Sequence, residues 1–388
     1  MRIGLVLSKT PSYSETFFIS KIEGLLTYGH DVVLFVQKKD PSFSLCPVNL
    51  APKVYKKNKL LQLFKSILVF LTLFISRPKR LQKFIKLEKQ QQRSTLQILK
   101  NCYNNSHILK DNLDCLHFGF ATMAIQSENV AAAMNSKMAV SLRGYDVDIY
   151  PLQNKGCYEL LWEKVDKVHA ISNYTLNKGI ALGLSAKKLS SIITPAVDIS
   201  DFKYKHTEPQ EVPHFLTIGR LHWIKGHAYV LEALSKINNM GIAFDYSIIG
   251  SGRELGYLRY LIYQLGLEER VNLIGEVRHD NIKDYFKRSD FYIQYSLSEG
   301  FCNAVLEAQA MGLFCMVSDG GALPENVIDR KTGWVIPKRN VKALVNSITE
   351  VLNLPEAKKN EIKMAAIKRV SDHFNMEDYH KKFDSFYS

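Results

Sequence analysis

Short runs of apolar residues recur along the chain, and amphipathic stretches with helical spacing separate them. The runs at 3–7 and 31–36 flank an amphipathic stretch at 16–28 that ends at Gly29, which is the pattern of a strand, a helix and a second strand. Uninterrupted apolar runs of this length are typical of parallel strands buried on both faces. Further strands are predicted at 113–120, 139–142, 167–173, 214–218, 246–249, 291–295 and 334–336. The pattern therefore predicts an α/β fold built from two Rossmann-like patterns in succession.

The length of the chain also favours two domains, since 388 residues are too many for one ordinary domain. Residues 199–213 are polar and carry prolines near their end, so we expect them to link the two halves. We place the first domain at 1–205 and the second at 206–371. The apolar fraction of 46% and the charged fraction of 23% are those of a soluble globular protein.

The most hydrophobic stretch, 60–75, predicts a helix with a narrow polar stripe, and at about 16 residues it is short for a bilayer span. The polar stripe consists of Gln62, Lys65, Thr72 and Ser76. Between 53 and 89 there are eleven Lys or Arg and one acid, Glu88, so this segment carries most of the net charge of +13. Together these features predict contact with an anionic membrane surface. A core helix with a solvated basic face is the alternative, and binding to nucleic acid is not expected because no recognition motif accompanies the charge.

The cysteines and the first residues fit a protein of the cytoplasm. The six cysteines lie far apart without a Cys-x-x-Cys pair, as expected of small core residues in a reducing compartment. The apolar run at 3–7 is too short for the hydrophobic region of a signal peptide, so we expect it to form a first buried strand.

Two glutamates stand where a strand passes through a polar loop into a helix. The strand at 291–295 precedes the loop, and a helix is predicted at 303–311 with Asn303 as its N-cap. Backbone N–H groups near the N-cap and the carboxylates of Glu299 and Glu307 are able to bind an anion and sugar hydroxyls. Each glutamate alone is also explained as a solvated loop residue or as a first-turn acid favoured by the helix dipole.

A second polar cluster follows the strand at 214–218 in the sequence Gly-Arg-Leu-His-Trp-Ile-Lys-Gly, residues 219–226. Arg220 and Lys225 lie five positions apart at a strand-to-helix turn, where the two cations can converge on a diphosphate. The glycines at 250, 252 and 256 do not form the dinucleotide fingerprint and predict only a tight turn.

The two clusters together resemble the donor site of family 4 retaining glycosyltransferases, which have the GT-B fold. The resemblance rests on the motif at 298–308, on its continuation at 318–325, and on the motif at 219–226. It implies two Rossmann-like domains that face each other across a deep cleft, with residues 372–388 forming a helix that crosses back onto the first domain. It further implies that Arg220, Lys225 and Glu299 act in catalysis. Donor contacts are implied for Gly219, Val277, Gly300, Phe301, Cys302, Asn303 and Glu307.

The first half is similar to the colanic-acid and amylovoran type of exopolysaccharide transferase. The Ser-Glu-Thr-Phe around Glu15 and the His-Phe-Gly at His117 carry this likeness, which makes His117 a candidate catalytic residue and Glu15 either a helix cap or an acceptor contact. A His with a purely structural role is the alternative for His117. Family members commonly have His-Gly-x-Asp where this chain has Arg143 and Asp146. An Arg cannot shuttle a proton near neutral pH, so anion binding or transition-state stabilisation is left for Arg143. Arg143 and Asp146 are both expected on the acceptor side or in the cleft.

The implied reaction is transfer of a sugar, with retention of configuration, from a UDP-sugar or GDP-sugar to a lipid-linked or polysaccharide acceptor in bacterial surface polysaccharide biosynthesis. Neither a cofactor nor a metal is expected, since the two cations offset the charge of the diphosphate. The protein is expected on the inner face of the cytoplasmic membrane. An epimerase of nucleotide sugars on the same fold is one alternative, and a GT-B subunit that binds a nucleotide sugar without turnover is the other.

Overall fold

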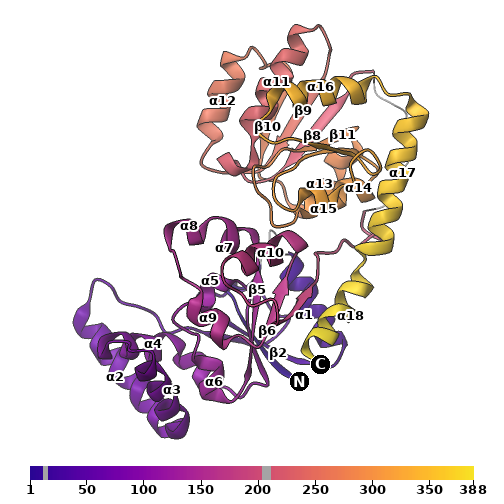
Figure 1. Ribbon diagram of the computed structural model, residues 1–388. Helices are drawn as coiled ribbons and strands as arrows, with labels where there is room; N and C mark the ends of the chain where they lie inside the picture. Colours follow the sequence, from indigo (N-terminus) through magenta and orange to yellow (C-terminus); the bar gives the residue numbers. More distant parts are fainter. Residues whose placement is uncertain (12–15, 203–210) are drawn as a thin grey trace. The chain divides into compact units, whose positions relative to one another are not determined.

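The computed structural model describes residues 1–11, 16–202 and 211–388. They form two compact units (Figure 1). The first comprises Met1–Ile171, Thr175–Ile193 and His380–Ser388, and the second comprises Ser172–Tyr174 and Thr194–Tyr379. The domain boundary predicted after residue 205 lies outside the described residues.

The first unit is built on a parallel sheet of seven strands in the order β3-β2-β1-β4-β5-β6-β7. The strands are β1 (Arg2–Val6), β2 (Asp31–Val36), β3 (Val48–Leu50), β4 (Cys115–Phe118), β5 (Lys137–Leu142), β6 (Lys167–Ala170) and β7 (Leu189–Ile192). The helices that connect them are α1 (Thr16–Thr27), α2 (Lys59–Ser76), α3 (Pro78–Gln90), α4 (Thr95–Leu109), α5 (Ala121–Ala124), α6 (Val130–Met134), α7 (Gly144–Asp148), α8 (Tyr150–Gln153), α9 (Glu159–Lys164) and α10 (Asn173–Ala181).

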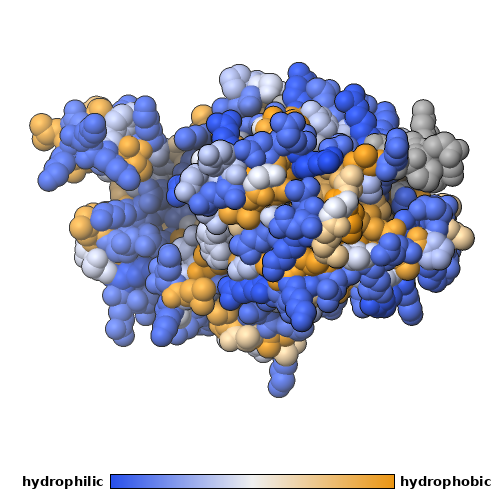
Figure 2. All heavy atoms as spheres, turned by 90° about the horizontal axis from the view of Figure 1, so that it is seen from above, coloured by the Kyte–Doolittle hydropathy of each residue, from blue (hydrophilic) through white to orange (hydrophobic). Residues whose placement is uncertain are grey.

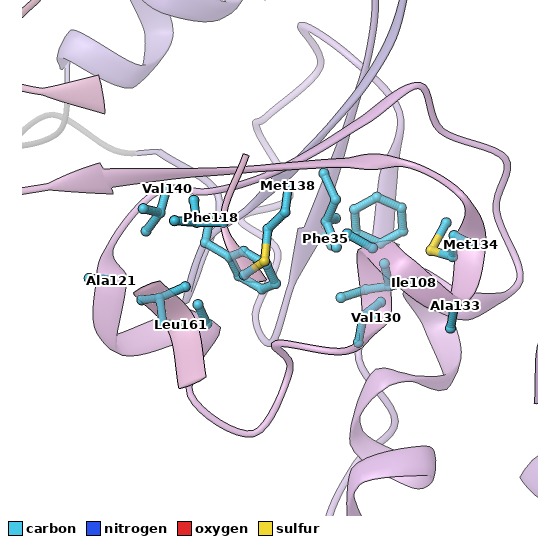
Figure 3. Packing of buried hydrophobic residues seen from close by; sticks show 14 of the residues in the cluster. Phe35, Ile108, Phe118, Ala121, Val130, Ala133, Met134, Met138, Val140 and Leu161 are labelled. Atoms are coloured by element: carbon cyan, nitrogen blue, oxygen red, sulfur yellow. The ribbon is translucent and has the colours of Figure 1, made fainter. Parts of the chain in front are cut away.

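The core of the first unit fills the space between this sheet and its helices (Figure 3). Phe35 from β2, Phe118 from β4 and Val140 from β5 meet Ile108 from α4 and Leu161 from α9, and all five are at most 2% exposed. Their burial explains why the strands are continuous apolar runs rather than alternating ones.

The second unit has a parallel sheet of six strands in the order β10-β9-β8-β11-β12-β13. Its strands are β8 (His214–Ile218), β9 (Asp245–Ile249), β10 (Val271–Gly275), β11 (Phe291–Gln294), β12 (Phe314–Ser318) and β13 (Trp334–Ile336). Its helices are α11 (His227–Asn239), α12 (Leu255–Gln264), α13 (His279–Lys287), α14 (Asn303–Ala310), α15 (Leu323–Asn326), α16 (Val341–Leu352) and α17 (Glu356–His373). The strand order reverses between β8 and β11, and the crevice at such a switch point is where α/β sheets bind ligands.

The last helix, α18 (Met376–Tyr387), ends within the first unit. Asp384 pairs with His30 at 2.9 Å, and the ammonium of Lys167 donates to the carbonyl of Phe386 at 2.8 Å. Phe383, Phe386 and Tyr387 are buried there. The predicted return of the terminal helix to the first domain is thus present.

The predicted helix at 60–75 is α2, and it packs beside α3 and α4 (Figure 1). The alternative that α2 is a core helix is wrong, because Leu73 is its only buried residue. Part of the predicted polar stripe faces the protein: the side-chain oxygen of Gln62 accepts from the N–H of Tyr55 at 2.8 Å. The side-chain amide of Gln62 also donates to Ser66 at 3.1 Å.

Candidate active site

The two predicted polar clusters lie at the carboxyl ends of neighbouring strands in the second unit. Gly219 and Arg220 directly follow β8, and a 3-10 helix at Trp223–Lys225 leads into α11. Glu299 lies in the loop between β11 and α14. Because β8 and β11 pair in parallel on either side of the switch point, their loops share one edge of the sheet.

Lys225 and Glu299 form a direct ion pair across these loops. Each side chain is 13% exposed, so the pair is largely removed from water. Burial acts to lower the pKa of Lys225, but the attraction of the Glu299 carboxylate outweighs it and raises that pKa above its usual value. Lys225 is therefore a charged ammonium whose partner is a carboxylate, a combination that an incoming anion is able to rearrange.

A chain of buried polar side chains on β11 and in the loop that follows it orients Glu299. The Tyr292 hydroxyl donates to the carbonyl of the Gln294 side chain at 2.9 Å, and the Gln294 amide donates to the Ser296 hydroxyl at 2.8 Å. Ser296 in turn donates to the Glu299 carboxylate at 3.0 Å. The sequence analysis missed these residues, although alternating polar positions at the end of an otherwise buried strand are a signal of a shared polar face.

The backbone of Glu299 rests on Gly321, in the segment that continued the family likeness. Gly321 has φ +69°, and a Cβ at this position would lie 2.3 Å from the carbonyl oxygen of Glu299. The N–H of Ala322 donates to that same carbonyl at 2.8 Å. Only glycine fits here, because the loop that carries Glu299 approaches so closely.

Replacing Gly321 with alanine is expected to displace Glu299 and to lower kcat/KM at least about tenfold, since small displacements of an active-site group are costly. Gly241→Ala is the matched control: Gly241 has φ +77° with no heavy atom within 4 Å of the added Cβ. Both changes strain the backbone by about 1 kcal/mol, so this strain lowers the melting temperature of both variants similarly. Only Gly321→Ala adds a clash with the carbonyl oxygen of Glu299. Equal activity of the two variants would contradict the supporting role of Gly321.

The glycines at 250 and 252 form the predicted tight turn, which supports the Arg220 loop, whereas Gly256 lies in α12 and not in the turn. A Cβ at Gly250 would lie 2.0 Å from the carbonyl oxygen of Gly219. The N–H of Leu221 donates to the carbonyl of Ser251 at 2.9 Å. The turn thus fixes the backbone on both sides of Arg220, whose side chain is exposed.

The start of α14 differs from the prediction by one residue. The N-cap is Cys302 and not Asn303, which is the first helical residue. Asn326, which the sequence analysis did not single out, accepts from the Cys302 N–H at 3.1 Å and donates to the Cys302 carbonyl at 3.0 Å. The N–H of Cys302 is therefore already bonded to Asn326, which corrects the expectation that it binds a donor.

Burial raises the pKa of the Cys302 thiol to about 12, so the thiol is not a nucleophile near neutral pH.

The other predicted donor contacts have different surroundings. Glu307 lies in α14 and is 9% exposed. Phe301 is buried, with its ring 5.7 Å from that of Phe374, and Gly300 is buried as well. Val277 follows β10 and is half-buried, two strands away from β8.

His117 does not lie at a surface that a substrate can touch, which corrects its prediction as a catalytic residue. The side chain is 0% exposed within β4. One ring nitrogen contacts the Ser141 hydroxyl at 2.8 Å and the other contacts the Tyr387 hydroxyl at 2.6 Å. Burial lowers the pKa of His117 well below its usual range, and Lys21 beside it acts in the same direction. His117 is a neutral structural residue.

Arg143 and Asp146 are close together after β5. The Arg143 guanidinium stacks at 4.0 Å from the ring centre of Phe17 and 4.6 Å from that of Phe18. Asp146 accepts from the Arg143 N–H at 3.3 Å, and burial raises the pKa of this carboxyl to about 6. Both side chains are buried, with Arg143 8% exposed. Glu15 lies outside the described residues.

A metal site would need a cluster of His, Cys, Asp or Glu. Within 1–11, 16–202 and 211–388, no group of three or more such residues is arranged to hold an ion.

The chain is similar to known glycosyltransferases in sequence. Residues 198–369 match the family model described as glycosyl transferases group 1. The chain is 25% identical to the amylovoran biosynthesis glycosyltransferase AmsK of Erwinia amylovora, over 97% of this chain and 96% of AmsK. It is 24% identical to the putative colanic acid biosynthesis glycosyltransferase WcaL of Escherichia coli K12, over 99% of each chain. Among solved structures, Anabaena HepE in complex with UDP-glucose has a TM-score of 0.73 and 17% identity, over 99% of this chain and 98% of HepE.

Proposed function

We propose that this chain, a glycosyltransferase of the GT-B fold whose residues 198–369 match group 1, transfers a sugar from a nucleoside-diphosphate sugar with retention of configuration. The predicted α/β GT-B fold class is confirmed by these matches, and so is the predicted likeness to glycosyltransferases of the amylovoran and colanic-acid type. Retention of configuration belongs to the proposal. The observation that carries the proposal is the Lys225–Glu299 pair at the switch point of the second sheet. Arg220 lies on the same loop as Lys225, between β8 and α11.

The chemistry of the donor suits these residues. A diphosphate carries charges that Arg220 and Lys225 offset, and the bond to the sugar breaks more easily when the leaving phosphate is stabilised. Glu299 and Glu307 are acceptors for hydroxyl groups of the sugar and the ribose. HepE, which shares the fold, binds UDP-glucose, and this supports a UDP-sugar as the first donor to test.

The ion pair adds a step to donor binding. In the free protein Glu299 holds the charge of Lys225. When the diphosphate arrives, Lys225 turns to the phosphate and Glu299 is released to accept from a sugar hydroxyl. Binding of the diphosphate thereby prepares the group that orients the sugar: the ammonium gains an anionic partner and the carboxylate gains a hydroxyl donor.

In the proposed reaction the acceptor hydroxyl attacks the anomeric carbon on the face that the phosphate leaves. The carbon–oxygen bond to the diphosphate breaks as the new glycosidic bond forms. The acceptor proton passes to the departing phosphate oxygen, so no side chain need act as a base. Buried His117, whose two ring nitrogens contact Ser141 and Tyr387, and charged Arg143 are consistent with this route, since neither offers a base to the acceptor.

We propose a lipid-linked or polysaccharide acceptor at the inner face of the cytoplasmic membrane. The amylovoran and colanic acid transferases that are similar over nearly the whole chain support a role in surface polysaccharide synthesis. The exposed apolar helix α2 supports an acceptor held at a membrane.

The test is a thermal-shift and calorimetric screen against UDP, GDP, ADP, CDP and their common sugar conjugates, with and without EDTA. A rise in melting temperature with one nucleoside diphosphate that survives EDTA is expected. Incubation of that donor without acceptor separates transfer from the epimerase alternative, because an epimerase converts the sugar with no acceptor present. The proposal fails if no nucleoside diphosphate binds or if the sugar is epimerised.

A further inference from the structure

The exposed face of helix α2 is almost wholly apolar. At 3.6 residues per turn, its exposed apolar residues fall within an arc of about 140°. They are Leu60, Leu63, Phe64, Ile67, Leu68, Leu71, Phe74 and Ile75, between 40% and 81% exposed. Single apolar residues among polar ones are normal at a protein surface, and Figure 2 shows many of them. A continuous apolar face on one helix is a different feature and marks an interaction site.

The inner face of α2 is mixed: Leu61, Val69 and Phe70 are half-buried there, and Phe70 packs against the core. Gln62 and Ser66 point toward the chain and bond to each other, and Lys65 and Thr72 lie outside the apolar arc. Leu73 alone is buried. In an amphipathic helix of a soluble protein the main apolar stripe faces the core, whereas the wider apolar arc of α2 faces away from it.

α2 meets the length and composition of a membrane-crossing helix, with 18 residues and a mean hydropathy of 1.7. Both of its flanks are nevertheless attached to the same unit. The Tyr103 hydroxyl donates to the carbonyl of Lys53 at 2.7 Å, and the side chain of Arg77 donates to the carbonyl of Lys110 at 3.2 Å. A helix held on both sides by one folded domain cannot pass through a bilayer, so its apolar face is suited to lie along a surface.

The segment around α2 is strongly basic. Residues 53–89 carry eleven cations against Glu88, which is buried and already paired with Arg93 at 2.7 Å. Lys79, Lys86 and Lys89 are exposed on α3. Arg80 has a different role from the one its charge suggests, because it donates to the carbonyl of Leu109 at 2.7 Å. The charge favours an anionic partner, and the apolar face favours acyl chains.

We propose that α2 lies in the plane of an anionic lipid bilayer, with its apolar arc among the acyl chains and the exposed lysines at the phosphate groups. The proposal deepens the proposed function, on which it rests for the lipid-linked acceptor, by naming the membrane partner and the helix that binds it. Neither lipid contact nor α2 takes part in binding the nucleotide.

The experiment uses flotation of the full chain with vesicles of phosphatidylcholine containing 30% phosphatidylglycerol. The double variant Ile67→Glu/Leu71→Glu places two charges at the centre of the arc. Met364→Glu/Tyr263→Glu is the matched control, because these two positions are also exposed and lie on α17 and α12 in the second unit. We expect the α2 variant to lose at least about tenfold in vesicle partitioning and the control to partition as the parent does. Equal partitioning of the two variants would overturn the proposal.

Depth is measured with a Phe64→Trp variant, whose added fluorescence should be quenched by lipids brominated on the acyl chain. Absence of this quenching would refute lipid binding. A lipid-free dimer in sedimentation that Ile67→Glu/Leu71→Glu dissociates would also refute it and would assign the arc to a second copy of the chain. The thermal shift with the nucleoside diphosphate is recorded for the same variants. If the shift is retained while flotation is lost, α2 binds lipid independently of the donor site. Failure of the shift in the parent would instead count against the proposed function alone.

Discussion

Lys225→Met is expected to lower kcat/KM by roughly a thousandfold, because it removes one of the two cations that offset the leaving diphosphate. It should also weaken binding of the nucleoside diphosphate at least about tenfold while leaving the matching nucleoside unaffected. Methionine keeps most of the volume of the buried lysine stem. The change also leaves Glu299 without its cation, so some loss of stability accompanies the loss of activity.

Glu299→Gln is the control that makes this result informative. Glutamine has the same shape but no charge to hold Lys225, so the ammonium is free for the phosphate. The nucleoside diphosphate should then bind as tightly as in the parent or more tightly, while turnover falls by roughly a hundredfold because the sugar loses its carboxylate acceptor. Loss of the cation is thus expected to weaken binding of the diphosphate, whereas loss of the carboxylate charge is expected to leave it unchanged or to strengthen it.

Calorimetry with the nucleoside, the nucleoside diphosphate and the intact donor measures these affinities, and steady-state kinetics measures turnover. If Lys225→Met weakened nucleoside and nucleoside diphosphate equally, Lys225 would not bind the diphosphate. If Glu299→Gln weakened the diphosphate as strongly as Lys225→Met does, the exchange of partners on donor binding would be excluded.

The sequence predicted which residues form this site but not how they meet. The short apolar runs and their turn residues were enough for two parallel sheets, and two charged motifs followed strands that proved adjacent. The ion pair itself joins residues 74 positions apart, and no local pattern encodes it. The sequence did not reveal the polar chain through Gln294, because a buried strand is normally apolar and polar residues alternate with apolar ones only from Tyr292 to Ser296.

His117 and α2 show two physical limits of such prediction. The motif around His117 identified the residue, but its environment is set by Tyr387, which lies 270 positions away on the returning terminal helix. For α2 the periodicity gave the helix and its polar stripe. Periodicity cannot say whether an apolar face packs on the protein or faces outward, so the sequence left a core helix as the alternative, and only the structure shows that Leu73 alone is buried in α2.

The returning helix is also where the largest loss of stability is expected. Phe383 is 1% exposed, and its ring lies 4.9 Å from that of His169. The ammonium nitrogen of Lys21 lies 4.4 Å from the centre of the Phe383 ring, and burial lowers the pKa of Lys21 well below its usual range. Phe383 therefore packs over Lys21 and His169 and keeps both side chains out of water.

Phe383→Ala is expected to lower the free energy of unfolding by about 3 to 5 kcal/mol, the usual cost of an emptied aromatic site in a core. The first unit should melt roughly 10 °C lower, as measured by calorimetry. Lys382→Ala, the next residue on the same helix, is exposed and should change the melting temperature little. The nucleoside diphosphate should still bind to the Phe383→Ala protein below its melting temperature, because the donor residues belong to the second unit. A melting temperature equal to that of Lys382→Ala would mean that α18 does not hold the first unit together.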